Sequence, residues 1–401
     1  MLFIWDLHFK ADKKDQIFNK LQEKISQINP ENIIFLWDYI YHFAYNPKVI
    51  WEFFDFCLTL SEDKKVYILA WNHDYIKGHF IFQEAEKALK LANSNLKIIS
   101  QPQVEVINNK KILFLPFFTN ILTEQDFVET DKLIKGTKLP DKSILNQIFV
   151  KAYQNRKQDD KNLKISWSIN LILLKNYIQH QPDLIVHHFY TENTVFPGQF
   201  AKFSFKNIAL DEKIFELETE IISGHLHQPF KHKNYVCVGS FWNTSPLEEN
   251  DTKIIFHYPD KFYQVVINPY ISLEEEKFKT IDENVIKSTF SQATEEISKN
   301  LQSRIIPDNF DIKQFNLIIK TKNFKQAESK LAPALVNKIS KIQYRQKTKK
   351  LWNILQQLEI NQDQLAVSFS SWKNLAKEYI KKKYPENYQE YLEELEELGL
   401  S

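Results

Sequence analysis

The feature that most constrains the fold is a repeated alternation of short apolar runs with helical stretches over residues 1–258. Runs rich in β-branched and aromatic residues, such as NIIFL (32–36) and KVYILA (65–70), predict strands, and stretches such as 13–28 and 82–92 predict helices. This alternation indicates a layered α/β domain. The other predicted strands are MLFI (1–4), LKIIS (96–100), KKILFLPF (110–117), DLIVHH (183–188), TEIIS (219–223) and YVCVGS (235–240).

From about residue 271 the pattern predicts a smaller β-α-β-α-β unit. Its expected strands are 271–281, 315–321 and 341–347, and its expected helices are 283–302 and 324–339. Beyond residue 351 the pattern is helical and closes with the acidic run YLEELEELGL. We therefore expect three parts: 1–258, 259–350 and 351–401.

Composition limits the class of protein. The chain is 43% hydrophobic and 26% charged, which is ordinary for a globular protein. No apolar run approaches the roughly 18 residues of a membrane span, so no membrane association is expected. With Cys57 and Cys237 as its two cysteines, the chain fits a cytoplasmic location. A net charge of +1 gives no argument from bulk charge for a nucleic-acid partner.

Polar side chains follow five of the predicted strands at the point where each strand ends. The carboxyl ends of strands in α/β sheets line the crevice where ligands bind, so we expect these side chains to converge. Aspartate, histidine and asparagine without cysteine suit manganese, iron or zinc. The residues are Asp6 and His8, Asp38, Asn72 and His73, His187 and His188, and His225 and His227.

Without His73 and His188, seven of these residues are candidate ligands. Seven ligands are too many for one ion and about right for two. Two ions roughly 3.5–4 Å apart can clamp a phosphate and activate a water. His73 is then available to stabilise the transition state or to protonate the leaving oxygen. We expect Asp74 and His188 to support the ligands. For His188 the reason is that it follows His187, and adjacent side chains of a strand point in opposite directions.

Together the motifs WDLH, WDYI, WNHDY, VHHF and GHLH resemble those of the calcineurin-like metallophosphoesterase superfamily. The resemblance implies a four-layer α-β-β-α sandwich over 1–258 and two divalent ions, manganese first, with iron, zinc or magnesium as alternatives. It implies a catalytic His73 that contacts the substrate phosphate. It further implies one metal bound by Asp6, His8, Asp38 and His227, and a second bound by Asp38, Asn72, His187 and His225.

Within that superfamily, WDYIYHFAYNPKVIWEFFDF, GHLHQPF and VGSFWNTSP resemble segments of the SbcD-type nucleases of double-strand-break repair and recombination. This resemblance implies an exonuclease and endonuclease that acts on DNA as a homodimer. It implies that residues 259–350 form an α+β capping domain. The helical C-terminus, 351–401, would bind a coiled-coil ABC-type ATPase subunit of the SbcC type. No residue that contacts DNA, other than His73, is predicted.

Two other functional interpretations are open. The chain could be a calcineurin-like phosphoesterase that acts on a small phosphoester, which activity on a small phosphodiester without preference for DNA would indicate. It could also be a non-catalytic scaffold with this fold, which need not hold two ions per chain.

Three tryptophans depart from the family pattern. Before the ligand in three motifs the family has a small residue, most often glycine, where this chain has Trp5, Trp37 and Trp71. An indole there is expected to overpack the site by about 1–3 kcal/mol or more. Either the chain diverged and carries tryptophan, or its gene reads UGA as glycine and was translated with another code. UGG codons at the three positions would exclude the second interpretation.

Overall fold

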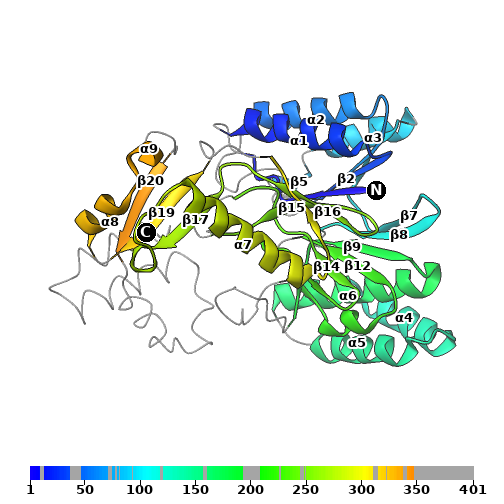
Figure 1. Cartoon of the computed structure of the whole chain (residues 1–401). Helices are drawn as coiled ribbons and strands as arrows, with labels where there is room; N and C mark the ends of the chain where they lie inside the picture. The colour runs from blue at the N-terminus through cyan, green and yellow to red at the C-terminus, as the bar shows by residue number, and fades with distance from the viewer. Residues whose placement is uncertain are drawn as a thin grey trace. The chain divides into compact units, whose positions relative to one another are not determined.

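The computed structural model describes residues 1–9, 13–36, 47–70, 75–76, 79–80, 82–92, 94–117, 121–156, 160–192, 208–224, 227–243, 248, 250–309, 315–321, 323–336 and 341–346. The described part is mixed α/β, as the sequence predicts (Figure 1). Contacts divide the chain into two units. The first comprises 1–271, 281–317 and 332–341, and the second comprises 272–280, 318–331 and the chain from 342 onward.

The first unit contains a seven-stranded mixed sheet in the order β18-β16-β15-β1-β2-β3-β6. Strands β1, β2, β3 and β6 run parallel, and β15 pairs antiparallel with β1. Asp6 and His8 directly follow β1, so the first predicted motif lies at the carboxyl ends of the parallel strands. The bounds are β1 (Leu2–Trp5), β2 (Asn32–Leu36), β3 (Lys65–Leu69), β6 (Leu96–Ile99), β15 (Lys253–His257), β16 (Lys261–Val265) and β18 (Ile305–Ile306).

A six-stranded mixed sheet in the order β13-β14-β12-β9-β8-β7 also belongs to the first unit. Its central strands β14, β12, β9 and β8 are parallel, and the two edge strands are antiparallel to their neighbours. Parallel strands are buried on both faces, which explains their continuous apolar runs. The bounds are β7 (Gln103–Ile107), β8 (Lys110–Leu115), β9 (Leu184–His187), β12 (Glu220–Ser223), β13 (Phe230–His232) and β14 (Tyr235–Cys237).

Helices cover each sheet on one side. Figure 1 shows α1, α2 and α3 beside the β1–β2 region, and α4, α5 and α6 beside β9 and β12. Helix α1 buries an amphipathic stripe that includes Ile17, Leu21 and Ile25, whereas α6 is buried over the whole run 165–171. The bounds are α1 (Lys14–Ile28), α2 (Pro47–Leu60), α3 (Gln83–Leu91), α4 (Glu124–Gly136), α5 (Lys142–Asn155) and α6 (Lys161–His180).

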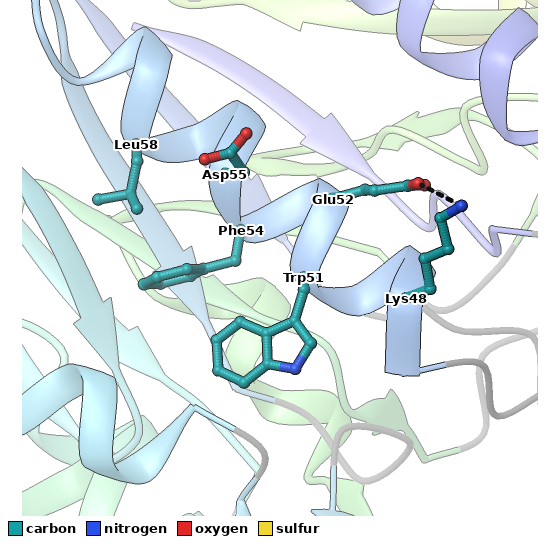
Figure 2. Close-up of a pocket in the computed structure, with 6 residues that line it drawn as sticks. All are labelled: Lys48, Trp51, Glu52, Phe54, Asp55 and Leu58. Atoms are coloured by element: carbon teal, nitrogen blue, oxygen red, sulfur yellow. Dashed lines mark ion pairs between the residues drawn. The ribbon is translucent and has the colours of Figure 1, made fainter.

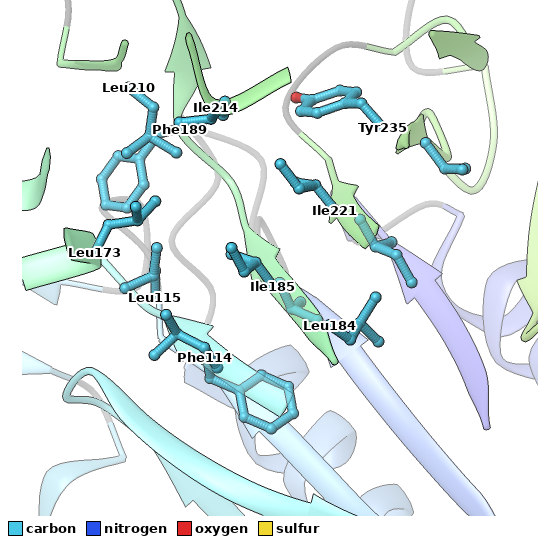
Figure 3. Packing of buried hydrophobic residues seen from close by; sticks show 14 of the residues in the cluster. Phe114, Leu115, Leu173, Leu184, Ile185, Phe189, Leu210, Ile214, Ile221 and Tyr235 are labelled. Carbon is cyan, nitrogen blue, oxygen red and sulfur yellow. The ribbon is translucent and has the colours of Figure 1, made fainter. Parts of the chain in front are cut away.

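Two hydrophobic clusters form the core. Along β1, Phe3 and Trp5 belong to one cluster and Leu2 and Ile4 to the other, because successive side chains of a strand point to opposite faces. The cluster of Leu2 and Ile4 includes the buried residues of α1 and α2. The cluster of Phe3 and Trp5 includes both the six-stranded sheet and α4–α6, and Figure 3 shows part of its packing around Ile185. The seven-stranded sheet is therefore apolar on both faces.

Shorter elements complete the first unit. Two-stranded sheets pair β4 with β5 and β10 with β11, and helix α7 follows β17 in the chain. Asp282 caps α7 by accepting a hydrogen bond from the backbone N–H of Val285. The bounds are β4 (Tyr75–Ile76), β5 (His79–Phe80), β10 (Tyr190–Thr191), β11 (Ala209–Leu210), the 3-10 helix η2 (Glu212–Glu216) and α7 (Glu283–Leu301). A second 3-10 helix, η4 (Glu275–Lys277), belongs to the second unit.

A three-stranded sheet in the order β17-β19-β20 accounts for most of the described second unit, together with α8. The predicted helix 324–339 is wrong as a single element, because it is interrupted after Lys330. Pro333 has no backbone N–H to donate and begins the separate helix α9. The bounds are β17 (Tyr270–Glu274), β19 (Asn316–Thr321), β20 (Lys341–Gln346), α8 (Phe324–Lys330) and α9 (Pro333–Val336).

The strand predicted at 271–281 is right only in its first part, because β17 ends at Glu274 and Glu275–Lys277 form the 3-10 helix η4. The remaining predicted elements of the described chain are present. Each of the eight apolar runs of 1–258 contains a strand, and the helices predicted at 13–28, 82–92 and 283–302 are α1, α3 and α7. The predicted division into 1–258, 259–350 and 351–401 stays a prediction. Residues 259–271 and 281–317 group by their contacts with the first unit, and 351–401 lie outside the described residues. Within the described residues no helix is long and apolar enough to cross a membrane.

Candidate metal centre

The loop after β1 carries the first two candidate ligands in an uncommon backbone conformation. Asp6 has a φ of 42° and His8 a φ of 40°, in the left-handed region that residues other than glycine rarely adopt. The backbone N–H of Asp6 still donates to Leu36 O at 3.3 Å, which keeps the loop in register with β2. Such strain persists only where surrounding structure imposes it, and it is concentrated at functional sites.

His227, from the segment after β12, meets this loop. The Nε2 atoms of His8 and His227 are 3.2 Å apart, although the residues are 219 positions apart in the chain. One donor atom each from Asp6, His8 and His227 lies within 4.8 Å of the other two. The structure thus brings together three of the four residues predicted to hold one metal; the fourth, Asp38, lies outside the described residues.

The donor set fits a divalent cation by its chemistry and spacing. Two nitrogens bound to one ion at about 2.1 Å, at angles of about 90–110°, lie roughly 3.0–3.4 Å apart. The separation of 3.2 Å between the His8 and His227 nitrogens falls in that range. A carboxylate with two imidazoles suits manganese, iron or zinc. That these residues bind a metal stays a prediction.

A buried ion pair lies behind His227. Glu248 Oε1 is 2.8 Å from His227 Nδ1, and Glu248 Oε2 is 2.7 Å from Lys253 Nζ. Burial alone would raise the pKa of the Glu248 carboxyl, but Lys253 and His227 outweigh burial and bring that pKa well below its usual range. Burial alone would lower the pKa of the Lys253 ammonium, but Glu248 and Asp251 outweigh it and raise that pKa. Both partners are therefore charged.

The turn at residues 239–243 joins the two ligand segments by hydrogen bonds. The indole N–H of Trp242 donates to Leu7 O at 2.7 Å, and the backbone N–H of Phe241 donates to Trp5 O at 3.1 Å. Gly239 has a φ of 81°, and a Cβ there would lie 2.8 Å from His227 O. Only glycine combines that conformation with so close an approach.

His187 and His188 at the end of β9 are both fully buried. Burial lowers the pKa of His187 to about 3, and its Nδ1 accepts a hydrogen bond from the backbone N–H of Phe189 at 3.1 Å. Among the described residues, none hydrogen-bonds to His187 Nε2. His188 Nε2 lies 3.4 Å from Asp6 Oδ1, so His188 touches a candidate ligand. Their roles as ligand and support stay predictions.

Trp5 lies in the core and packs against a glycine. Its ring stacks on Phe3 with centroids 5.9 Å apart, and the side chain is 1% exposed. A Cβ at Gly224 would lie 1.7 Å from the Trp5 ring and 2.7 Å from His188 Nδ1. No described residue accepts a hydrogen bond from the Trp5 indole N–H. The indole fits only because position 224 has no side chain.

Five predicted site residues lie outside the described residues: Asp38, Asn72, His73, Asp74 and His225. His187 is consequently the one described member of the second predicted ligand set. Trp37 and Trp71 also lie outside the described residues. The structure adds supporting residues that motif reasoning missed, namely Ser240, Trp242, Glu248 and Lys253.

Comparisons with known proteins identify no family for this chain. No protein-family model matches the sequence, and no curated protein matches it. Among solved structures, the chain is similar to the crystal structure of a protein of unknown function from Aquifex aeolicus, with 13% identity over 54% of this chain and 91% of that chain. The TM-score is 0.23, so this likeness carries no argument about fold or function.

Proposed function

We propose that this chain is a two-metal phosphodiesterase of the calcineurin-like type, and a DNA exonuclease and endonuclease of the SbcD type. The observation that carries the proposal is the meeting of Asp6, His8 and His227 at the ends of strands in two different sheets. The two core clusters, with helices outside each sheet, support the four-layer α-β-β-α sandwich expected of such enzymes.

In this proposal Asp6, His8, Asp38 and His227 hold one cation, and Asp38, Asn72, His187 and His225 hold the other. When bound, divalent cations neutralise phosphate charge and activate a water. His73 hydrogen-bonds the phosphate or protonates the leaving oxygen. Because Nδ1 of His187 accepts a hydrogen bond, its neutral ring carries the proton on Nε2, so ligation through Nε2 requires that the Phe189 hydrogen bond be released.

The proposal extends to a second copy of the chain, to a capping domain and to an ATPase partner. Helix α2 presents Trp51, Phe54 and Leu58 around a surface groove of about 620 Å³ (Figure 2), and Trp51 is 58% exposed. That apolar face suits the proposed homodimer. The sheet β17-β19-β20 with α8 is the proposed capping domain, and 351–401 is the proposed contact for an SbcC-type ATPase.

The test is cleavage of end-labelled duplex DNA by the purified chain with Mn²⁺, compared with its chelated form. We expect His8→Asn to reduce Mn²⁺-dependent cleavage by about 100-fold or more, because it disrupts a ligand nitrogen. His180→Asn is the matched control, since His180 is the last residue of α6 and belongs to neither predicted ligand set. The same assay should include the chain with glycine at 5, 37 and 71.

Three outcomes separate the interpretations. Cleavage of DNA that His8→Asn abolishes supports the nuclease. Hydrolysis of bis-p-nitrophenyl phosphate without DNA cleavage supports a small-substrate phosphoesterase instead. Absence of both activities in every form, together with absence of bound metal, supports the scaffold.

A further inference from the structure

Glu248 and Lys253 form a buried ion pair, and each of the two side chains hydrogen-bonds to His227. Lys253 is 1% exposed, and its Nζ donates to His227 O at 3.0 Å while it pairs with the Glu248 carboxylate. The other oxygen of that carboxylate faces His227 Nδ1 at 2.8 Å. His227 is thereby held at its ring and at its backbone by two oppositely charged groups. A buried pair of this kind is costly to assemble and adds little net stability by itself.

The surrounding turn holds the same unit in place. The backbone N–H of Ser240 donates to His227 O at 3.2 Å, and the Asn243 side chain donates to Glu248 O at 2.8 Å. Ser240 Oγ donates to Trp242 O at 3.1 Å, and Trp242 in turn donates to Leu7 O. The backbones of His227 and Glu248 are therefore hydrogen-bonded to one turn, which also bonds the loop of Asp6 and His8.

The direction of the hydrogen bond between Glu248 and His227 decides which nitrogen of the His227 ring can bind a metal. A carboxylate only accepts hydrogen bonds, so His227 Nδ1 carries the proton and donates a hydrogen bond to Glu248. The lone pair of the neutral ring is then on Nε2, the atom 3.2 Å from His8 Nε2 in the candidate centre. Carboxylate–histidine pairs behind metal ligands fix tautomer and ring orientation in this way.

We infer that Glu248, held by Lys253, is the positioning residue that presents His227 Nε2 to the metal centre. This inference rests on the proposed function, because it names the support of one of the proposed ligands. The role belongs to the carboxylate and its hydrogen bond to Nδ1.

The test compares two double variants that share Lys253→Met, so that neither leaves a buried ammonium without its partner. Glu248→Gln/Lys253→Met keeps an oxygen that can accept from His227 Nδ1, and Glu248→Leu/Lys253→Met removes it. Mn²⁺ dissociation constants are measured by titration calorimetry on protein whose fold is checked by circular dichroism. We expect the Leu variant to bind Mn²⁺ about 10–100-fold more weakly than the Gln variant. Equal dissociation constants would overturn the inference.

A second measurement needs no variant of Glu248 and covers the case in which the Leu variant does not fold. Long-range ¹H–¹⁵N spectra of the metal-free chain at about pH 8 report which ring nitrogen carries the proton. We expect His227, assigned with His227→Asn, to be protonated on Nδ1, and protonation on Nε2 would overturn the inference. If the unaltered chain binds no Mn²⁺, the proposed function fails, while this spectrum still judges the pairing of Glu248 with His227.

Discussion

Two buried tryptophans flank the loop of Asp6 and His8, and their surroundings differ. Trp242 donates its indole N–H to Leu7 O at 2.7 Å and belongs to the turn that carries the Glu248 network. Trp5 lies on the other side, where no described residue accepts from its indole N–H and Gly224 is in contact with the ring. We call the first the bonded side (Ser240, Trp242, Glu248 and Lys253) and the second the apolar side (Trp5, His187 and Gly224).

The two sides differ in whether their buried hydrogen-bond donors have acceptors. A buried donor without an acceptor costs free energy, so each such group in a native protein needs an explanation. On the apolar side both Trp5 Nε1 and His187 Nε2 are in this state among the described residues. The His187 nitrogen has an explanation if it serves an ion. For the Trp5 nitrogen the described residues offer none, a state that it shares with the indole nitrogen of Trp167.

The largest expected effect tests the packing of the apolar side. Gly224→Ala should lower the free energy of unfolding by about 3 kcal/mol or more, because the new Cβ would lie 1.7 Å from the Trp5 ring. Gly224→Ala should lower that free energy much less in a protein that already carries Trp5→Ala. Urea denaturation of the unaltered chain, the two single variants and the double variant measures the energetic coupling between positions 5 and 224.

Gly136→Ala is the matched control for that cycle. Gly136 is the last residue of α4, and a Cβ there would have no atom within 4 Å. It should change stability by less than about 1 kcal/mol. If Gly224→Ala were as mild with Trp5 present, the indole would not occupy the position described for it.

The next effect concerns His187, also on the apolar side. Its pKa is about 3 in the folded chain and about 6.5 in the unfolded chain, so below pH 6.5 the unfolded state binds the extra proton. Its contribution to stability is present above about pH 6.5 and is lost as pH falls toward 3. Between pH 7 and pH 5 this group alone should lower the free energy of unfolding by about 2 kcal/mol.

Denaturation of chelated protein at the two pH values measures this loss. His187→Asn keeps an acceptor near the Phe189 N–H and cannot titrate. It should therefore remove about 2 kcal/mol of the change in unfolding free energy between pH 7 and pH 5. An unchanged pH dependence in the variant would mean that His187 is not held neutral by burial.

The smallest effect compares the two indoles directly. Trp242→Phe removes the donor to Leu7 O, whereas Trp5→Phe removes a donor that no described residue accepts. We therefore expect Trp242→Phe to cost about 1–2 kcal/mol more than Trp5→Phe, because it leaves a buried carbonyl without its partner. Thermal unfolding of both variants gives the difference. Equal losses would contradict the division into a bonded and an apolar side.

Local pattern accounts for much of the described fold. Strands such as 2–5 and 184–187 are short, apolar and β-branched or aromatic, so their prediction needs no knowledge of their partners. At Pro333 local pattern misleads, since the helical pattern on both sides of it predicts one element where the structure has α8 and α9. Position in the sheet was not local either: β1 pairs with β15, where Leu2 lies opposite His257, and no periodicity in either strand could indicate that pairing.

The amino-acid order alone determined which groups could act: an aspartate and histidines directly after apolar strands, in motifs whose combination points to metal chemistry. The tertiary structure alone decided that Glu248 faces His227 and that Lys253 is buried beside it. The run NTSPLEEND around Glu248 has no period and looks like an exposed loop. Burial of a charge becomes favourable only when an opposite charge and a donor meet it in space, and that meeting depends on the packing of distant segments.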